Sequence, residues 1–244
     1  MVLKIYVGWD PGETRSYEVC VHSLRRSTSP IDIIPITQAA LRRSGLYRRT
    51  TQPDGTDWID GKPFSSEFAF TRFLVPALNQ YQGWALFCDC DFLFREDVAK
   101  LFSLADDRYA VMVVRHAMRK REGTKKQGAV QQNYACKNWS SLVLWNCGHP
   151  ENLSLSVDDV STKPGRWLHQ FRWLESHLIG GLPKEWNWLE GHSSLSLTPN
   201  AVHFTRGAPW MDGYATASYA DEWFATEEAI RLAKETVRPG RLYG

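Results

Sequence analysis

The chain has 244 residues and a formal net charge of +2 at pH 7, from 29 basic and 27 acidic side chains. This balance gives no strongly basic surface, so we expect no nucleic-acid partner. An apolar content of 43% is typical of a globular protein with a substantial core. No apolar run reaches membrane-spanning length and no signal-peptide core is present, so we expect a cytoplasmic protein, with peripheral contact at the inner membrane surface left open. The five cysteines lack metal-type spacing, and we expect reduced thiols.

The first part of the chain alternates strands with helices. In chain order, the sequence predicts a strand at 2–7, a helix at 13–24, a strand at 31–36, a helix at 38–46, a loop at 50–63, a helix at 66–78 and a strand at 84–88. Pro35 cannot donate a hydrogen bond to a neighbouring strand, which favours an edge position for the second strand. Strands that alternate with helices indicate a mostly parallel sheet with right-handed crossovers.

The second part of the chain is less regular. A short helix begins at Asp97, a strand is predicted at 109–114, and a basic, polar segment extends over 115–132. A loop of that length in a compact domain is either disordered or functional. A strand at 140–145 follows, and then helices at 168–178 and 221–236. No internal repeat is present, so we expect one α/β domain over residues 1–244.

Two carboxylates interrupt the apolar stretch "ALFCDCDFLF", residues 85–94. Asp89 and Asp91 lie where a buried strand ends, and a carboxylate among aromatic side chains is costly unless a positive group meets it. Because ligands of open α/β sheets bind beyond the carboxyl ends of strands, both side chains can project toward one cation. Oxygen ligands suit Mg²⁺ or Mn²⁺ together with phosphate and water. The alternative is a structural role for Asp91, as a helix N-cap or in a salt bridge.

Five segments in order resemble glycosyltransferase family 8, the glycogenin and galactosyltransferase group of metal-dependent enzymes with the A-type fold. "VLKIYVGWD" is similar to the family's first strand, "EFAFTRFLVPAL" to its Arg-bearing helix and "ALFCDCDFLF" to its D-x-D segment. "NWSSLVLWNC" is similar to the donor-sugar strand and "VHFTRGAPW" to the late His segment. The motifs "KNWSS", "LP-x-x-WN" and "H-[FWY]-T" are closer to a group of bacterial glycosyltransferase-like proteins. The resemblance implies a single Rossmann-like domain with a nucleotide-binding half at 1–114 and a donor-sugar and acceptor half at 115–244.

The same resemblance implies a set of site residues. Asp89, Asp91 and His203 are the implied metal ligands, and an imidazole beside two carboxylates favours Mn²⁺ over Mg²⁺. A lone histidine such as His203 is otherwise a hydrogen-bonded core residue. The implied donor-binding residues are Asp10, Arg72, Asp89, Cys90, Asn138, Ser140, Ser141, Arg206 and Gly207.

Two of these residues have alternatives of equal interest. Arg72 lies in an apolar segment, where an arginine is rarely buried without a partner, so we expect it to reach the donor or Asp89. A salt bridge with Glu67 or a surface position is the alternative for Arg72. Asp10 follows the first strand and is placed either to bind the base or ribose or simply to form an Asp-Pro-Gly turn.

The sequence departs from the family pattern near the diphosphate. No lysine follows His203 in "VHFTRGAPW". Arg206 is expected to take the phosphate role, because a guanidinium matches phosphate oxygens in pairs. Lys125 and Lys126 of the basic segment are further candidates.

A second departure concerns the reacting carbon. The family's Asp-Gln-Asp motif is absent from "LHQFRWLES". The catalytic candidates are Gln170, Glu175 and Arg72. An inverting reaction would need a general base, for which Glu175, Asp159, Asp212 and His169 remain open.

The predicted function is the transfer of a sugar from a nucleotide sugar, with UDP as the expected nucleotide, to a hydroxyl acceptor. The cofactor is Mn²⁺ or Mg²⁺, the configuration is retained, and the acceptor is a glycan, a lipid-linked glycan or another hydroxyl compound. A nucleotidyltransferase is the weaker enzyme alternative, because "GWDPGETRSY" is poor in glycine for a phosphate-binding loop. A non-catalytic protein with a degenerate glycosyltransferase fold that binds nucleotide or glycan is the second alternative, kept open by the missing Asp-Gln-Asp motif.

Overall fold

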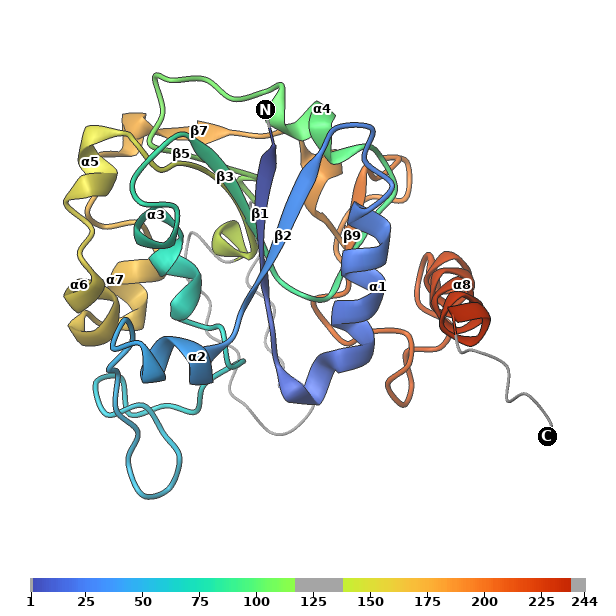
Figure 1. Cartoon of the computed structure of the whole chain (residues 1–244), viewed down its shortest axis with the longest axis horizontal. Helices are drawn as coiled ribbons and strands as arrows, with labels where there is room; N and C mark the ends of the chain where they lie inside the picture. The colour runs from blue at the N-terminus through green and yellow to red at the C-terminus, as the bar shows by residue number, and fades with distance from the viewer. Residues whose placement is uncertain (1, 117–137, 238–244) are drawn as a thin grey trace, which may run out of the picture.

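The structure is a computed structural model that describes residues 2–116 and 138–237 (Figure 1). A six-stranded sheet with the order β2-β1-β3-β6-β5-β7 forms its centre. Its strands are β1 (Leu3–Gly8), β2 (Ile31–Ile36), β3 (Trp84–Cys88), β5 (Val111–Val113), β6 (Leu142–Asn146) and β7 (Ile179–Gly181). Only β6 runs antiparallel to its neighbours in this sheet, so the carboxyl ends of β1, β2, β3, β5 and β7 lie at one edge. The predicted mostly parallel α/β sheet is confirmed.

The long helices agree with the sequence prediction better than the short ones. The helices are α1 (Thr14–Leu24), α2 (Gln38–Arg43), α3 (Val75–Leu78), α4 (Val98–Phe102), α5 (Pro150–Leu153), α6 (Val157–Thr162), α7 (Gly165–His169) and α8 (Ala220–Val237). In Figure 1, α1 and α8 lie on one side of the central sheet, and α3, α5, α6 and α7 lie on the other.

Two predicted helices are wrong over much of their length. The segment 66–78 contains only the 3₁₀ turn η2 (Thr71–Leu74) and α3, which begins at Pro76's neighbour Val75 because a proline breaks a continuous helix but is tolerated in its first turn. The segment 168–178 contains the end of α7 and the 3₁₀ turn η4 (Ser176–Leu178). Phe171 has a φ of 51°, which a continuous α-helix excludes.

A second, three-stranded sheet has the order β4-β9-β8. Its strands are β4 (Phe92–Phe94), β8 (Trp188–Leu189) and β9 (Ala201–His203). It packs with α1 and α8 through a separate apolar cluster, made of Val19, Leu93, Trp188, Val202, Phe204 and Trp223. The acidic stretch 89–91 connects β3 of the large sheet to β4 of the small one, and β9 ends at His203. The two sheets therefore meet at the predicted metal ligands.

Two further observations concern membrane-spanning helices and the cysteines. Within the described ranges, no helix is long and apolar enough to cross a membrane. Cys20, Cys88, Cys90 and Cys147 are free and buried. The fifth cysteine, Cys136, and most of the basic segment, including Lys125 and Lys126, lie outside the described residues.

Candidate metal centre and donor site

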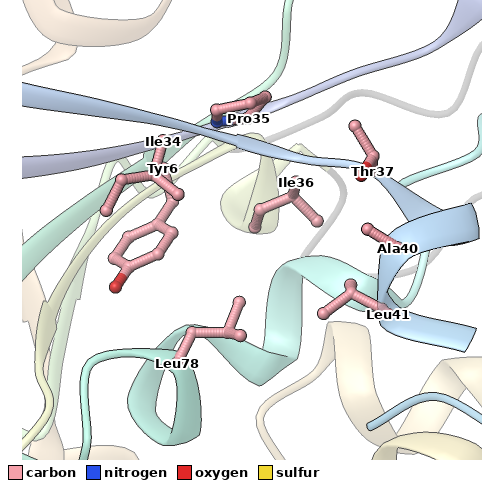
Figure 2. A pocket seen from close by; sticks show the side chains of 8 residues that line it. All are labelled: Tyr6, Ile34, Pro35, Ile36, Thr37, Ala40, Leu41 and Leu78. Carbon is pink, nitrogen blue, oxygen red and sulfur yellow. The ribbon is translucent and has the colours of Figure 1, made fainter. Parts of the chain in front are cut away.

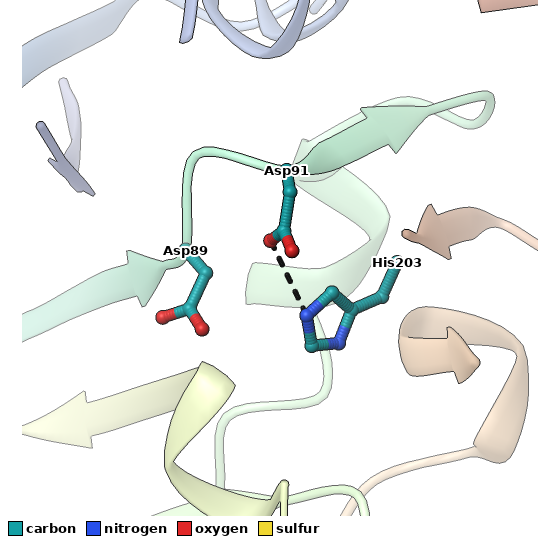
Figure 3. A group of neighbouring side chains, drawn as sticks. All are labelled: Asp89, Asp91 and His203. Atoms are coloured by element: carbon teal, nitrogen blue, oxygen red, sulfur yellow. Dashed lines mark ion pairs between the residues drawn. The ribbon is translucent and has the colours of Figure 1, made fainter. Parts of the chain in front are cut away.

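Asp89, Asp91 and His203 converge at the carboxyl end of β3 (Figure 3). One ligand atom from each residue lies within 4.8 Å of the other two. The imidazole is buried, whereas both carboxylates are only half-buried. Two oxygen ligands and one nitrogen ligand in a partly open position suit a divalent cation that keeps further positions for water and phosphate. The residues present therefore fit the metal that the sequence predicted.

The hydrogen-bond network determines which nitrogen of His203 faces the aspartates. Asn187, at the end of the 3₁₀ turn η5 (Lys184–Asn187), donates through Nδ2 to the Ser141 hydroxyl and the Asn138 carbonyl, at 3.0 and 3.3 Å. Its Oδ1 is therefore an acceptor, and His203 Nδ1 donates to it at 3.0 Å. Nε2 then faces Asp91 Oδ1 at 3.2 Å, and in the neutral imidazole this nitrogen is an acceptor. Two acceptors at this distance require a cation or a proton between them.

The backbone holds this imidazole against β4. His203 pairs with Phe92 across the antiparallel β4–β9 ladder, and their rings stack with centroids 4.4 Å apart. Phe204 donates its amide to the carbonyl of Asp91 at 3.0 Å. The ring is thus held by packing on one side and by Asn187 on the other, so it needs no rearrangement to accept a cation.

Arg72 contacts Asp89, which is one of the two partners that the sequence predicted for it. Its Nη1 lies 2.7 Å from Asp89 Oδ1 and also donates to the Ser140 carbonyl at 2.9 Å. Its Nε donates to the Phe68 carbonyl at 3.2 Å. The guanidinium is 5% exposed and lies over the rings of Phe68 and Phe87. Arg72 therefore orients a carboxylate of the candidate metal centre from within the core, and the surface alternative is wrong.

The 3₁₀ turn η3 (Trp139–Ser141) carries the predicted donor-sugar residues at the amino end of β6. Asn138, which precedes the turn, has a φ of 64°, and its carbonyl accepts from the Ser141 hydroxyl at 2.7 Å. Asp89 donates its amide to the Ser141 carbonyl at 2.9 Å, which ties the turn to the acidic stretch. Both serines are buried, so their hydroxyls serve this internal network, and their contact with a donor sugar stays a prediction.

His169 lies beside this turn. Its Nδ1 shares a hydrogen bond of 2.8 Å with the Ser140 hydroxyl, and its ring contacts Phe73 at a centroid distance of 5.1 Å. Burial, together with the charges of Arg72 and Arg49, lowers the pKa of His169 to about 3. The imidazole is therefore neutral at physiological pH and connects α7 to the donor-sugar turn.

Glu13 adds a further carboxylate that the sequence reasoning missed. Burial raises its pKa to about 8, with the charges of Asp91, Asp10 and Asp89 adding to the effect. Cys90, which is fully buried, donates its thiol to Glu13 at 3.8 Å. The side chain of Cys90 is thus turned away from solvent, and a donor contact at this residue would come from its backbone. Glu13 thus lies close enough to Asp89 and Asp91 to feel their charges, which a divalent cation bound there would offset.

Asp10 forms the predicted turn. Its two carboxylate oxygens accept from the amides of Gly12 and Glu67, at 2.9 and 3.0 Å. These bonds connect the end of β1 to the segment that carries Arg72. A contact of Asp10 with base or ribose stays a prediction.

The catalytic candidates from the Asp-Gln-Asp region are not brought together. Gln170 Oε1 accepts from Arg172 Nε at 2.9 Å, on the exposed side of α7. Glu175 is 82% exposed in its side chain and lies 3.4 Å from His177. It precedes β7 at the amino end of that strand, which is the edge opposite the metal ligands. The predicted catalytic role of Glu175 is therefore corrected. Asp159 forms a capping box with Ser156 and is likewise a structural residue.

Arg206 and Gly207 lie just past His203. Arg206 is about half-exposed, and its Nη1 lies 4.0 Å from Glu190 Oε2, so its charge is partly balanced. Gly207 has a φ of 148°, and a Cβ there would lie 2.7 Å from the ring of Tyr214. Glycine is thus required at this turn by the backbone, whether or not a donor binds.

A small cavity lies away from these residues (Figure 2). It has a volume of about 190 Å³ and opens beside the edge strand β2. Its lining is mostly apolar, from Tyr6, Ile34, Pro35, Ile36, Thr37, Ala40, Leu41 and Leu78. None of the predicted site residues lines it, so it does not belong to the metal centre.

The fold has solved relatives among the glycosyltransferases. The galactosyltransferase LgtC, solved with donor and acceptor sugar analogs, superposes with a TM-score of 0.60 at 15% identity, over 93% of this chain and 96% of that one. The apo-form glycosyltransferase GlyE of Streptococcus pneumoniae TIGR4 has a TM-score of 0.60 at 17% identity over 93% of this chain, which spans only 60% of the length of GlyE. At these identities the likeness establishes the fold alone. The protein is therefore an α/β protein with the A-type glycosyltransferase fold.

The sequence also has a near relative among curated proteins. Protein CDI of Arabidopsis thaliana is 48% identical over 226 residues, which cover 90% of this chain and 84% of that protein. The chain belongs to the family of Protein CDI. This relative is from a plant, whereas the short motifs favoured bacterial proteins. No family profile matches the chain.

Proposed function

We propose that the protein is a metal-dependent glycosyltransferase that moves a sugar from a nucleotide sugar, with UDP as the expected nucleotide, to an acceptor hydroxyl. The observation that carries this proposal is the convergence of Asp89, Asp91 and His203 within 4.8 Å, at the ligand-binding edge of a glycosyltransferase fold. Mn²⁺ is the preferred cation, because the ligand set combines carboxylate oxygens with an imidazole nitrogen.

The proposed reaction depends on neutralising the negative charge of the leaving nucleotide. A bound divalent cation would neutralise negative charge on the leaving nucleoside diphosphate. The acceptor oxygen forms a bond to the anomeric carbon, the bond from that carbon to the diphosphate oxygen breaks with its electron pair, and the acceptor proton leaves with the nucleotide or to water. Arg72 holds Asp89 in position, and Asn187 holds His203, so the protein's contribution is a preorganised site.

The test is a screen of nucleotide sugars with purified protein. UDP-glucose, UDP-galactose, UDP-N-acetylglucosamine and GDP-mannose are incubated with and without Mn²⁺, and nucleotide release is measured. We expect Mn²⁺-dependent release from one of these donors and its loss in Asp91→Asn. Asp158→Asn is the matched control, because Asp158 lies in an exposed ion pair with Arg48. Absence of both Mn²⁺-dependent release and Mn²⁺-dependent UDP binding would overturn the proposal.

A non-catalytic nucleotide-binding protein is the second candidate, and one observation favours it. In the region of the missing Asp-Gln-Asp motif, Glu175 is exposed at the edge opposite the metal ligands, and the helix α7 presents His169 to Ser140. Thermal-shift titration separates the two candidates. Stabilisation by UDP with Mn²⁺, combined with no sugar release over hours, would favour the binding protein.

A further inference from the structure

The carboxyl edge of the central sheet presents polar side chains in the order of its strands. Asp10 follows β1, Asp89 follows β3, Ser140 precedes the antiparallel β6, His116 follows β5 and Lys184 follows β7. Neighbouring strands are about 4.8 Å apart, so each strand offers a separate position for part of a substrate. The sheet order, β1-β3-β6-β5-β7, therefore orders these positions along a line.

The proposed function assigns the first three positions. A cation at Asp89 and Asp91 would hold the diphosphate at β3, with the nucleoside toward β1 and the sugar toward the turn η3 at β6. The acceptor hydroxyl must reach the anomeric carbon from the side not occupied by the diphosphate. The carboxyl ends of β5 and β7 lie on that side.

The side chains at the carboxyl ends of β5 and β7 are positioned by hydrogen-bonded backbone. Val113 of β5 pairs with Gly181 of β7, and Leu182 donates its amide to the Val113 carbonyl at 2.9 Å. His116 and Lys184 each follow this pair by three residues. Lys184 also begins the turn η5, which ends at Asn187 beside His203. The two basic residues are thus built onto the same framework as the metal centre.

The surroundings of His116 are positive. Its Nε2 is buried and has no hydrogen-bond partner within residues 2–116 and 138–237. Burial lowers the pKa of His116 to about 4, and the charges of His203, Lys184 and His192 lower it further in the same direction. His192 donates its amide to Leu189, which pairs with His203 across β8 and β9.

The nearby carboxylate does not cancel this charge. Glu190 is 7% exposed, and its Oε2 lies 4.0 Å from Arg206. Arg206 therefore offsets the charge of Glu190 in part, and Lys184 forms no ion pair within the described part of the chain. The site has an acidic end around Asp89, Asp91 and Glu13 and a basic end around His116 and Lys184.

We propose that His116, Lys184 and His192 form an anion subsite for the acceptor, so that the acceptor carries a carboxylate or a phosphate near the hydroxyl that takes the sugar. This inference rests on the proposed function. Lys184 supplies the charge, and the imidazoles of His116 and His192 supply directed hydrogen bonds.

The experiment compares acceptors of the same ring with different charge. Glucose, glucuronic acid and glucose 6-phosphate are tested with Mn²⁺ and whichever nucleotide sugar the protein cleaves. We expect at least one charged acceptor to exceed glucose in kcat/KM by about tenfold or more, which corresponds to one good ionic contact. A preference for glucuronic acid assigns a carboxylate, and a preference for glucose 6-phosphate assigns a phosphate.

Variants of Lys184 and His116 test whether these residues cause the preference for a charged acceptor. Lys184→Gln and His116→Gln are expected to raise the KM for the charged acceptor about tenfold, while the KM for the donor changes less than about twofold. Lys234→Gln is the control, since Lys234 lies near the end of α8 in an exposed ion pair with Glu18. The inference would be overturned if glucose had the same kcat/KM as both charged acceptors. It would also be overturned if Lys184→Gln lowered kcat/KM equally for all three acceptors.

A binding measurement keeps the inference independent of turnover. Calorimetric titration of glucose 6-phosphate and glucuronic acid into the full chain, with glucose as reference, is expected to show binding that Lys184→Gln removes. Donor cleavage without any preference for charged acceptors would reject the subsite but retain the transferase. No Mn²⁺-dependent interaction with any nucleotide sugar would reject the transferase itself.

Discussion

Two arginine–aspartate pairs, Arg49–Asp57 and Arg72–Asp89, have buried guanidinium groups and differ in how their carboxylates are bound. Arg49 donates to both oxygens of Asp57, at 2.8 and 2.7 Å, and these side chains are 0% and 2% exposed. Arg72 donates to one oxygen of Asp89 at 2.7 Å, and these side chains are 6% and 16% exposed. We call the Arg49–Asp57 pair closed, because Arg49 binds both carboxylate oxygens, and the Arg72–Asp89 pair open, because the Asp89 carboxylate stays partly exposed.

The closed pair is part of a larger structural network. Arg49 also donates to the Lys163 carbonyl and to Asp60, and its guanidinium lies 3.8 Å from the ring centre of Phe70. Asp60 in turn accepts from the amide of Gly165 at 2.7 Å. This network holds the loop 47–63 onto α6 and α7. Burial of a charge alone therefore does not indicate a functional site; a partly exposed carboxylate beside other candidate metal ligands is the better indication.

The largest effect is expected at Asp91, which lies beside the open pair Arg72–Asp89. Asp91→Asn removes a ligand from the candidate metal centre, so Mn²⁺-dependent donor cleavage should fall by about a thousandfold or more. Unfolding free energy without metal should not fall, because the substitution also removes negative charge beside Asp89 and Glu13. Cleavage within tenfold of the unmodified protein would remove Asp91 from the metal site.

The closed pair should behave in the opposite way. Asp57→Asn leaves Arg49 buried without a balancing carboxylate, which should cost about 3–5 kcal/mol of unfolding free energy in urea titrations. The Mn²⁺ affinity of the folded fraction should stay unchanged. Asp54→Asn is the control, since Asp54 lies on the same loop but is exposed and bonds only Thr56. A loss below about 1 kcal/mol in Asp57→Asn would mean that the network is not structural.

A smaller effect is expected at the second support of the metal centre. Asn187→Ala removes the acceptor for His203 Nδ1, so the imidazole loses its fixed tautomer and orientation. The dissociation constant for Mn²⁺, measured by calorimetry, should rise about 10–100-fold. Asn187→Asp keeps an acceptor oxygen and should bind Mn²⁺ more tightly than Asn187→Ala. Equal affinities of the two variants would contradict this orienting role.

The smallest effect depends on pH. The pKa of Glu13 is raised to about 8, so the folded state holds a proton that the unfolded state releases near its ordinary value. Stability is therefore lost as pH rises from that ordinary range to about 8, and Glu13→Gln should avoid this loss. At pH 8.5 without metal, the variant should be more stable by roughly 1–3 kcal/mol, and at pH 4 the two proteins should match. Thermal unfolding at both pH values measures the difference in stability between Glu13→Gln and the unmodified protein, and Mn²⁺ should reduce this difference at pH 8.5. An equal difference at the two pH values would contradict the raised pKa of Glu13.

Sequence reasoning found the residues whose position follows from a strand end. Asp89 and Asp91 follow a five-residue apolar strand, and the convergence with His203 and the pairing with Arg72 agree with the structure. The register of parallel strands brings such ends together at one edge, which makes this part of the site predictable. Asn187 was missed, because nothing near it in the sequence indicates that its amide will meet an imidazole.

The errors arise from short elements. β7 has three residues and β8 has two, which is too short for an alternating pattern to be visible. Without β7, the segment 168–178 was interpreted as one helix, and Glu175 was placed near the site instead of at the opposite edge. The sequence predicts 50–63 only as a loop, and its buried contacts could not be predicted because its cover comes from α6 and α7, more than a hundred residues away in the chain.

The turn η3 has a consequence for how ligands of this site influence one another. Ser141 accepts the amide of Asp89 through its carbonyl and the amide group of Asn187 through its hydroxyl, so a single residue touches the supports of two metal ligands. Anything that orders or displaces this turn must change the affinity for the cation. By thermodynamic reciprocity, the cation changes the affinity of the turn for its own ligand by the same factor. If the proposed donor sugar and metal bind here, each would change the affinity of the site for the other through one serine.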